Sequence, residues 1–151
     1  MQAPATPAMV HEDAILLVSR LLLAWLFVHE GAFLVVNFGA ASASMAKLGV
    51  PALALIATIA LQLVAGIAMA IGWHARPGAA ALGLFCLVTA IQFHNNLAVR
   101  NELLHFEKDL AIAGGLFLLA VRGTGRWSLD ALRRARSAGS AVAAAGPRGA
   151  R

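Results

Sequence analysis

Four long apolar stretches alternate with short polar segments along this chain. They cover residues 14–37, 51–73, 78–97 and 102–121. A helix needs about 20 residues to cross the hydrocarbon core of a bilayer, so each stretch is long enough for one pass. Pro51 can open the second helix, the turn at Arg76-Pro77-Gly78 precedes the third, and Asn101 can cap the fourth. The pattern predicts an all-α integral membrane protein built as a four-helix transmembrane bundle.

The third and fourth stretches meet this length only if polar residues are included. Their purely apolar parts cover residues 79–91 and 110–121, which is too short for a full pass. Each predicted span therefore carries polar side chains at one end, at the edge of the membrane or within it. Ionisable groups at that depth are costly and often functional.

The segments that flank the four stretches have different compositions. Residues 1–13 are expected to be flexible, and residues 137–151, rich in Ala, Gly, Ser and Arg, to be disordered. Residues 122–136 form a basic segment in which Ser128 can cap a short amphipathic helix. Trp127, Leu129 and Leu132 would rest in the membrane interface while the arginines meet anionic headgroups.

Composition and charge support a membrane protein and set its orientation. Hydrophobic residues make up 60% of the chain, charged residues 13%, and the mean hydropathy is +0.78. Seven of the twelve basic residues follow the last apolar stretch, which indicates a partnership with anionic lipids and not with nucleic acid. With the 73–76 turn and Arg20 on the same side, the positive-inside rule predicts that both termini are cytoplasmic. The single cysteine, Cys86, excludes a disulfide framework and a cysteine-ligated cluster.

Several motifs stand out between residues 15 and 132. They are Arg20-Leu-Leu-Leu, Val28-His29-Glu30-Gly31, Gly66, Glu107-Lys108-Asp109-Leu110-Ala111 with Gly114-Gly115, and Gly125-Arg126-Trp127-Ser128-Leu129-Asp130. Together they resemble the DoxX family of small bacterial four-helix membrane proteins. The resemblance implies a location in the bacterial inner membrane. Some members of that family are named as subunits of a terminal quinol oxidase or a thiosulfate:quinone oxidoreductase, which implies a quinone and a partner redox subunit. The chain departs from the family where it has Gln62 in place of a common acidic residue, and Phe33 and Leu34 in place of a lysine.

The first two predicted helices carry four polar candidates. Helical positions allow Arg20 and Glu30 to face the bundle interior, while His29 points about 180° away from Arg20. Arg20 could contact an anion or a quinone carbonyl, or extend to lipid headgroups. Glu30 could be an ion-pair partner or proton carrier, or lie in the interface. Gln62 is most simply an interhelical hydrogen-bond donor.

The outer ends of the third and fourth predicted helices are the richest in polar residues. Gln92, Asn95 and Asn96 share one side of the third helix, and His94 points across from Gln92. Glu102, His105 and Asp109 form one stripe on the fourth helix, at i, i+3 and i+7. If this stripe faces inward, it predicts a polar pocket near the outer membrane face that also receives Glu30.

Such a pocket favours a quinone head or another small molecule. Proton transfer would fall to Glu30, His105 and Asp109, and binding to Arg20, His29, Gln62, Gln92, His94 and Asn95. Two alternatives are a metal at Glu102-x-x-His105 and a haem between His29 and His94, and the residues present give little support to either. A third is that these polar residues only form a solvated rim at the outer membrane face.

The function predicted is therefore that of a membrane subunit or accessory factor of a quinone-linked oxidoreductase. Electrons would come from a partner, since the chain has no cysteine ligands and no nucleotide-binding loop; whether the chain is itself an enzyme stays open. A small-molecule or ion transporter and a non-catalytic anchor for a peripheral enzyme are the alternatives.

Overall fold

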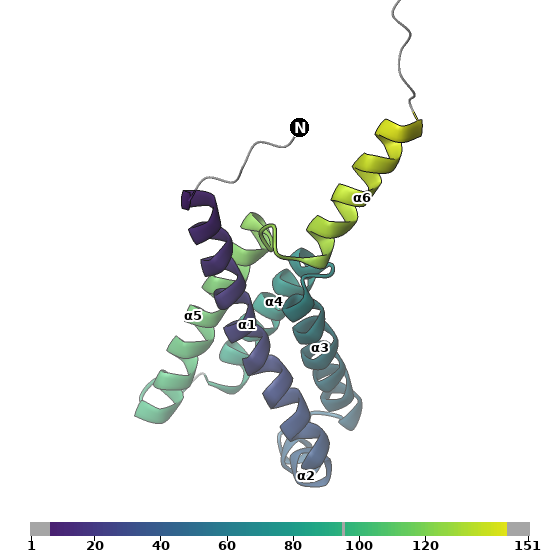
Figure 1. Cartoon of the computed structure of the whole chain (residues 1–151). Helices are drawn as coiled ribbons and strands as arrows, with labels where there is room; N and C mark the ends of the chain where they lie inside the picture. Colours follow the sequence, from purple (N-terminus) through teal and green to yellow (C-terminus); the bar gives the residue numbers. More distant parts are fainter. Residues whose placement is uncertain (1–6, 95, 145–151) are drawn as a thin grey trace, which may run out of the picture.

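The computed structural model describes residues 7–94 and 96–144, and within these the fold is entirely helical, as predicted (Figure 1). The helices are α1 (Pro7–Val36), α2 (Phe38–Lys47), α3 (Ala52–Ile71), α4 (Ala75–Phe93), α5 (Arg100–Arg122) and α6 (Leu129–Ala144). The predicted stretches correspond to α1, α3, α4 and α5, whose ends differ from the expected ones by a few residues in most cases.

The N-terminal end of α1 lies well before the expected residue 14. The helix begins at Pro7, and proline suits the first turn of a helix because its missing N–H would have no partner there. Residues 7–13, expected to be flexible, are therefore helical. Near this end of the helix, Glu12 contacts Arg122, the last residue of α5, and Asp13 contacts Arg126 in the loop that follows, which gives the extra turns a tertiary partner.

A short helix, α2, occupies the segment between the first two predicted spans, where a loop was expected. The side-chain amide of Asn37 donates to the Phe33 carbonyl at 2.9 Å, at the point where α1 ends and α2 begins. Helix α2 has only 10 residues, most of them Ala, Gly and Ser, so a search for apolar stretches long enough to cross the membrane did not reveal it. Gly49, with a φ of +72°, follows the end of α2 and turns the chain toward α3.

The four long helices pack in the order α1, α3, α4, α5. The α4–α5 contact is the most extensive, and α1 also makes a small contact with α5. Close approach of α1 and α3 depends on small residues, since a Cβ on Gly66 would lie 3.0 Å from Val28 Cγ2. The core between these helices includes Phe27, Met69 and Leu82.

Three helical segments are long and apolar enough to cross a membrane, namely Val10–Val36, Ala52–Ile71 and Ala75–Phe93. In the part of the chain that the structure describes, α5 does not reach this standard. Its first half carries the charged residues Glu102, Glu107, Lys108 and Asp109, which lower its mean hydropathy. The fourth pass therefore remains a prediction.

The C-terminal helix α6 projects away from the end of the bundle at which α1 begins (Figure 1). It extends to Ala144, so residues 137–144, expected to be disordered, are helical, in keeping with the high helix propensity of their alanines. Residues 1–6 and 145–151 lie outside the described residues, and the predictions for them stay untested.

Candidate functional site

A cavity of about 550 Å³ lies between α1, α3, α4 and α5, in the half of the bundle near α2. Its apolar wall comes from Leu26, Phe27, Phe85 and Ile112 among others. Its polar side chains are Glu30, Thr58, Gln62, Thr89, His94, His105, Lys108 and Asp109. We call this cavity the polar pocket. Its size lies within the range of small-molecule sites, about 300–1,000 Å³.

Two histidines and a glutamate lie between the surface of the protein and the polar pocket. His94 Nδ1 donates to Glu102 Oε2 at 2.8 Å, in a pair whose side chains are about 26% and 32% exposed. The His94 and His105 rings stack, with centroids 4.9 Å apart and planes inclined by 21°. His94 directly follows Phe93, the last residue of α4, and His105 lies about one turn after the start of α5, so the α4–α5 packing brings them together. This arrangement forms a line of titratable groups that leads inward.

Asp109 lies one helical turn beyond His105, next to Thr89 of α4. Thr89 Oγ1 lies 3.4 Å from Asp109 Oδ2 and 3.0 Å from the carbonyl oxygens of Phe85 and Cys86. A hydroxyl has a single hydrogen, so these three acceptors compete for it. The Asp109 carboxylate consequently keeps acceptor capacity for a guest in the pocket.

Gln62 of α3 is the buried polar group at the opposite wall. The residue is only 7% exposed, and its Oε1 atom has no hydrogen-bond partner among the described residues. The interhelical hydrogen bond expected from Gln62 is not among the bonds of these residues. An unpaired buried carbonyl oxygen costs about 1–3 kcal/mol, which a guest that donates a hydrogen bond would recover.

Glu30 forms the rim of the polar pocket, whereas its neighbour His29 lies outside. The two side chains are 52% and 58% exposed, with His29 Nδ1 3.8 Å from Glu30 Oε1. The His29 ring lies against Trp25, with centroids 5.8 Å apart, on the outer surface of α1. His29 therefore does not line the same cavity as His94, and the two do not share a haem-sized space in this arrangement.

Arg20, predicted to bind a cofactor, lies at the other end of the bundle. It is only 2% exposed, and its guanidinium donates to the Thr124 carbonyl at 3.0 Å and to the Trp127 carbonyl at 2.9 Å. Thr124 is 15 residues beyond Asp109, about 22 Å along a helix axis. Arg20 thus neither reaches the polar pocket nor extends to headgroups, because the loop after α5 covers it.

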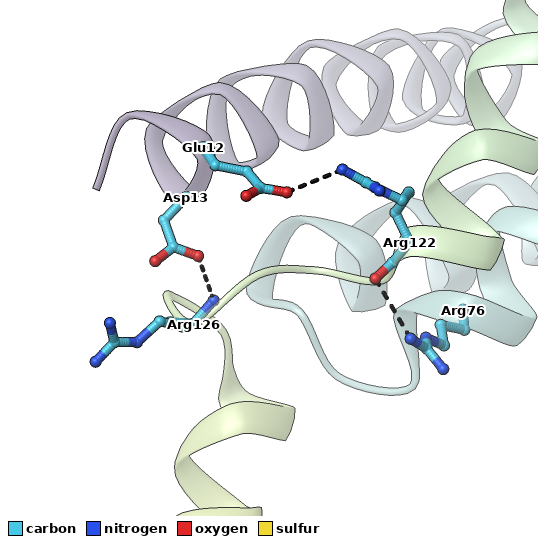
Figure 2. A network of polar contacts seen from close by, with 5 residues as sticks. All are labelled: Glu12, Asp13, Arg76, Arg122 and Arg126. Atoms are coloured by element: carbon cyan, nitrogen blue, oxygen red, sulfur yellow. Dashed lines mark hydrogen bonds and ion pairs between the residues drawn. The ribbon is translucent and has the colours of Figure 1, made fainter. Parts of the chain in front are cut away.

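Further polar contacts hold that loop, residues 123–128, against the start of α1 and α4. Figure 2 shows the Glu12–Arg122 ion pair at 3.0 Å, the Arg126 N–H donating to Asp13 Oδ1 at 2.8 Å, and Arg76 donating to the Arg122 carbonyl at 3.3 Å. The motif that was noted in the sequence at residues 125–130 therefore cross-links helix ends that are far apart in the chain.

The structure separates the predicted site residues into two groups. It brings together Glu30, Gln62, His94, His105 and Asp109, and it leaves Arg20, His29 and the exposed Gln92 outside the cavity. Asn95 lies outside the described residues. Sequence reasoning missed Thr89 and Lys108; the position of Thr89, one turn before Gln92 on a helix already rich in polar residues, was the available signal.

Comparison with known proteins identifies the family. The DoxX family model matches residues 15–95, which excludes the 125–130 motif. The chain is 36% identical over 121 residues to the inner membrane protein YqjF of Escherichia coli, a match that covers 80% of this chain and 93% of YqjF. It is 32% identical over 123 residues to the inner membrane protein YphA of the same organism, covering 77% and 88%. No solved structure matches. The chain therefore belongs to the DoxX family of membrane proteins.

Proposed function

We propose that this protein is a membrane subunit or accessory factor of a quinone-linked oxidoreductase that binds the quinone head group in the polar pocket. The observation that carries the proposal is the buried Gln62 Oε1, which lacks a partner among the described residues and lines the cavity opposite Asp109. A planar head group with two oxygens fits a pocket that has apolar walls and polar groups on opposite sides.

The residues present suit both states of such a substrate. The Gln62 carbonyl oxygen can accept a hydrogen bond from a quinol hydroxyl, and the ammonium group of Lys108, which also lines the polar pocket, can donate to a quinone carbonyl. Reduction of a quinone takes up two electrons and two protons. Asp109 and His105 are the proton carriers nearest to the cavity, and His94 and Glu102 connect them with the outer surface. The electrons come from a partner redox subunit.

We further propose that α5 completes a four-pass topology with both termini in the cytoplasm. Its 23 residues extend about 34 Å, long enough for one pass. Its charged half packs along α4, where Asp109 and His105 face the polar pocket and not lipid. The basic residues of the α3–α4 turn and of the C-terminal segment then lie on the cytoplasmic side. A reporter that works only outside the cytoplasm should be active when it is fused after residue 97. A reporter that works only in the cytoplasm should be active when it is fused after residue 144.

Bound quinone in purified protein tests the proposal directly. Protein extracted in mild detergent should contain quinone, or bind a short-chain quinone, in about equimolar amount. The Gln62→Leu and Asp109→Asn variants should lose it, whereas Gln92→Leu, which changes an exposed glutamine that does not line the polar pocket, should retain it. Wild-type protein that neither carries nor binds quinone would overturn the proposal.

A second candidate function is a non-catalytic anchor for a peripheral enzyme. It is favoured by α6, which stands clear of the bundle, and by two side chains that are nearly half exposed, Trp127 just before α6 and Leu132 within it. Removal of residues 129–151 should then release the partner enzyme from the membrane fraction, while the quinone content of the remaining protein stays unchanged.

A further inference from the structure

A second cavity, of about 560 Å³, lies beside the loop that connects α5 with α6. It is at the opposite end of the bundle from the polar pocket. Four arginines line it, namely Arg76, Arg122, Arg126 and Arg134. The rest of the lining comes from loop residues 123–125 and from Asp130 and Ala131. We call this cavity the arginine hollow.

Positive charge is in excess around the arginine hollow. Arg122 is paired with Glu12 at 3.0 Å. Within the described ranges, 7–94 and 96–144, the guanidinium groups of Arg76, Arg126 and Arg134 have no carboxylate within 4.0 Å. Asp130 is the one acidic residue of the lining, and its Oδ1 already accepts from the His74 N–H at 3.2 Å. An anion with one or two negative charges would balance this excess.

The loop backbone that lines the arginine hollow is held in place before any ligand binds. The buried Arg20 guanidinium holds the Thr124 and Trp127 carbonyls, and Asp13 holds the Arg126 N–H. Arg76 packs so closely under the loop that a Cβ on Gly123 would lie 2.9 Å from Arg76 Nε. A ligand would therefore order little backbone on binding, which favours affinity.

Guanidinium groups are suited to phosphate, because their planar array of N–H donors matches two phosphate oxygens. We propose that the arginine hollow is a binding site for a phosphate group, carried either by a phospholipid headgroup or by a small phosphate compound. This site is separate from the polar pocket and more specific than a general attraction between the basic tail and an anionic membrane, since it depends on Arg76 of α4 as much as on α6.

Binding to the full-length protein in detergent separates these possibilities. The probes are phosphatidylglycerol, zwitterionic phosphatidylethanolamine and inorganic phosphate. Native mass spectrometry measures their binding, and a competition experiment asks whether inorganic phosphate displaces phosphatidylglycerol. The test variant is R76Q/R126Q/R134Q. The matched control is R136Q, which removes an exposed arginine of the same helix that does not line the hollow.

We expect the triple variant to bind phosphatidylglycerol or phosphate at least about tenfold more weakly than wild type, and R136Q to differ less than about twofold. Competition by inorganic phosphate supports a site for the phosphate group itself, whereas binding of phosphatidylglycerol alone supports a lipid site. Equal losses in the triple variant and R136Q, or wild-type protein that binds no probe, would overturn the proposal. If the triple variant does not fold, R126Q and R134Q singly give the same test, because neither side chain has a hydrogen-bond partner in the described part of the chain.

Discussion

Replacement of Arg20 by methionine tests how the two ends of the chain are joined. The guanidinium is buried and donates to two loop carbonyls, of Thr124 and Trp127, which have no other side-chain donor among the described residues. Methionine fills much of the same volume without donating. Each carbonyl left unpaired costs about 1–3 kcal/mol, so the loss on the loop side is about 2–6 kcal/mol.

Part of this loss is offset because the variant no longer buries a charge whose Nε lacks a partner. We therefore expect Arg20→Met to lower the free energy of unfolding by about 3 kcal/mol. Titration with sodium dodecyl sulfate, followed by circular dichroism and tryptophan fluorescence, measures this, because Trp127 lies in the affected loop. Limited trypsin digestion should also cleave the variant faster after Arg126.

The control is Ser19→Ala, an exposed neighbour on α1 that should change stability by less than about 0.5 kcal/mol. An Arg20→Met variant as stable as Ser19→Ala would refute the argument. It would indicate that Arg20 contacts lipid headgroups and that the loop contacts contribute nothing.

Further variants test other parts of the structure. Gly66→Leu should separate α1 from α3 and destabilise the protein by about 1–3 kcal/mol, whereas Gly114→Ala, which has open space around its Cβ position, should be neutral or stabilising by up to about 1 kcal/mol; thermal unfolding of the pair decides. Asp13→Ala should cost about 1.5–3 kcal/mol because the Arg126 N–H loses the buried carboxylate that accepts its hydrogen bond, while Glu12→Ala, in an exposed pair, should cost less than about 1 kcal/mol. Equal effects of the two acidic substitutions would contradict this difference in burial.

The apolar pattern predicts the helical fold well but not its short elements. In lipid, a long run of Leu, Ala, Ile and Val satisfies its backbone hydrogen bonds by forming a helix, so three long apolar helices follow from composition and length. The helix α2 escapes prediction because its 10 residues are mostly small and too few to cross a membrane, and the extended start of α1 depends on the contact of Asp13 with a loop more than 110 residues away.

The candidate site is predictable only where one helix carries the information. The stripe of His105 and Asp109 on α5 indicates the face that lines the polar pocket. Helical angles within α1 do not reveal how α1 is rotated against its neighbours, which decides that Glu30 reaches the rim and His29 does not. The sequence places Arg20 near the 73–76 turn but does not reveal that it holds the loop after α5, because its two acceptors lie 104 and 107 residues away.

Photolabelling with a quinone analogue is the most direct test of the central claim that the polar pocket binds a quinone. A short-chain azidoquinone should label peptides of α3, α4 or α5 that line the cavity, and excess quinone should protect them. The Gln62→Leu variant should lose this labelling. Labelling that quinone does not prevent, or that falls on peptides away from the polar pocket, would contradict the account.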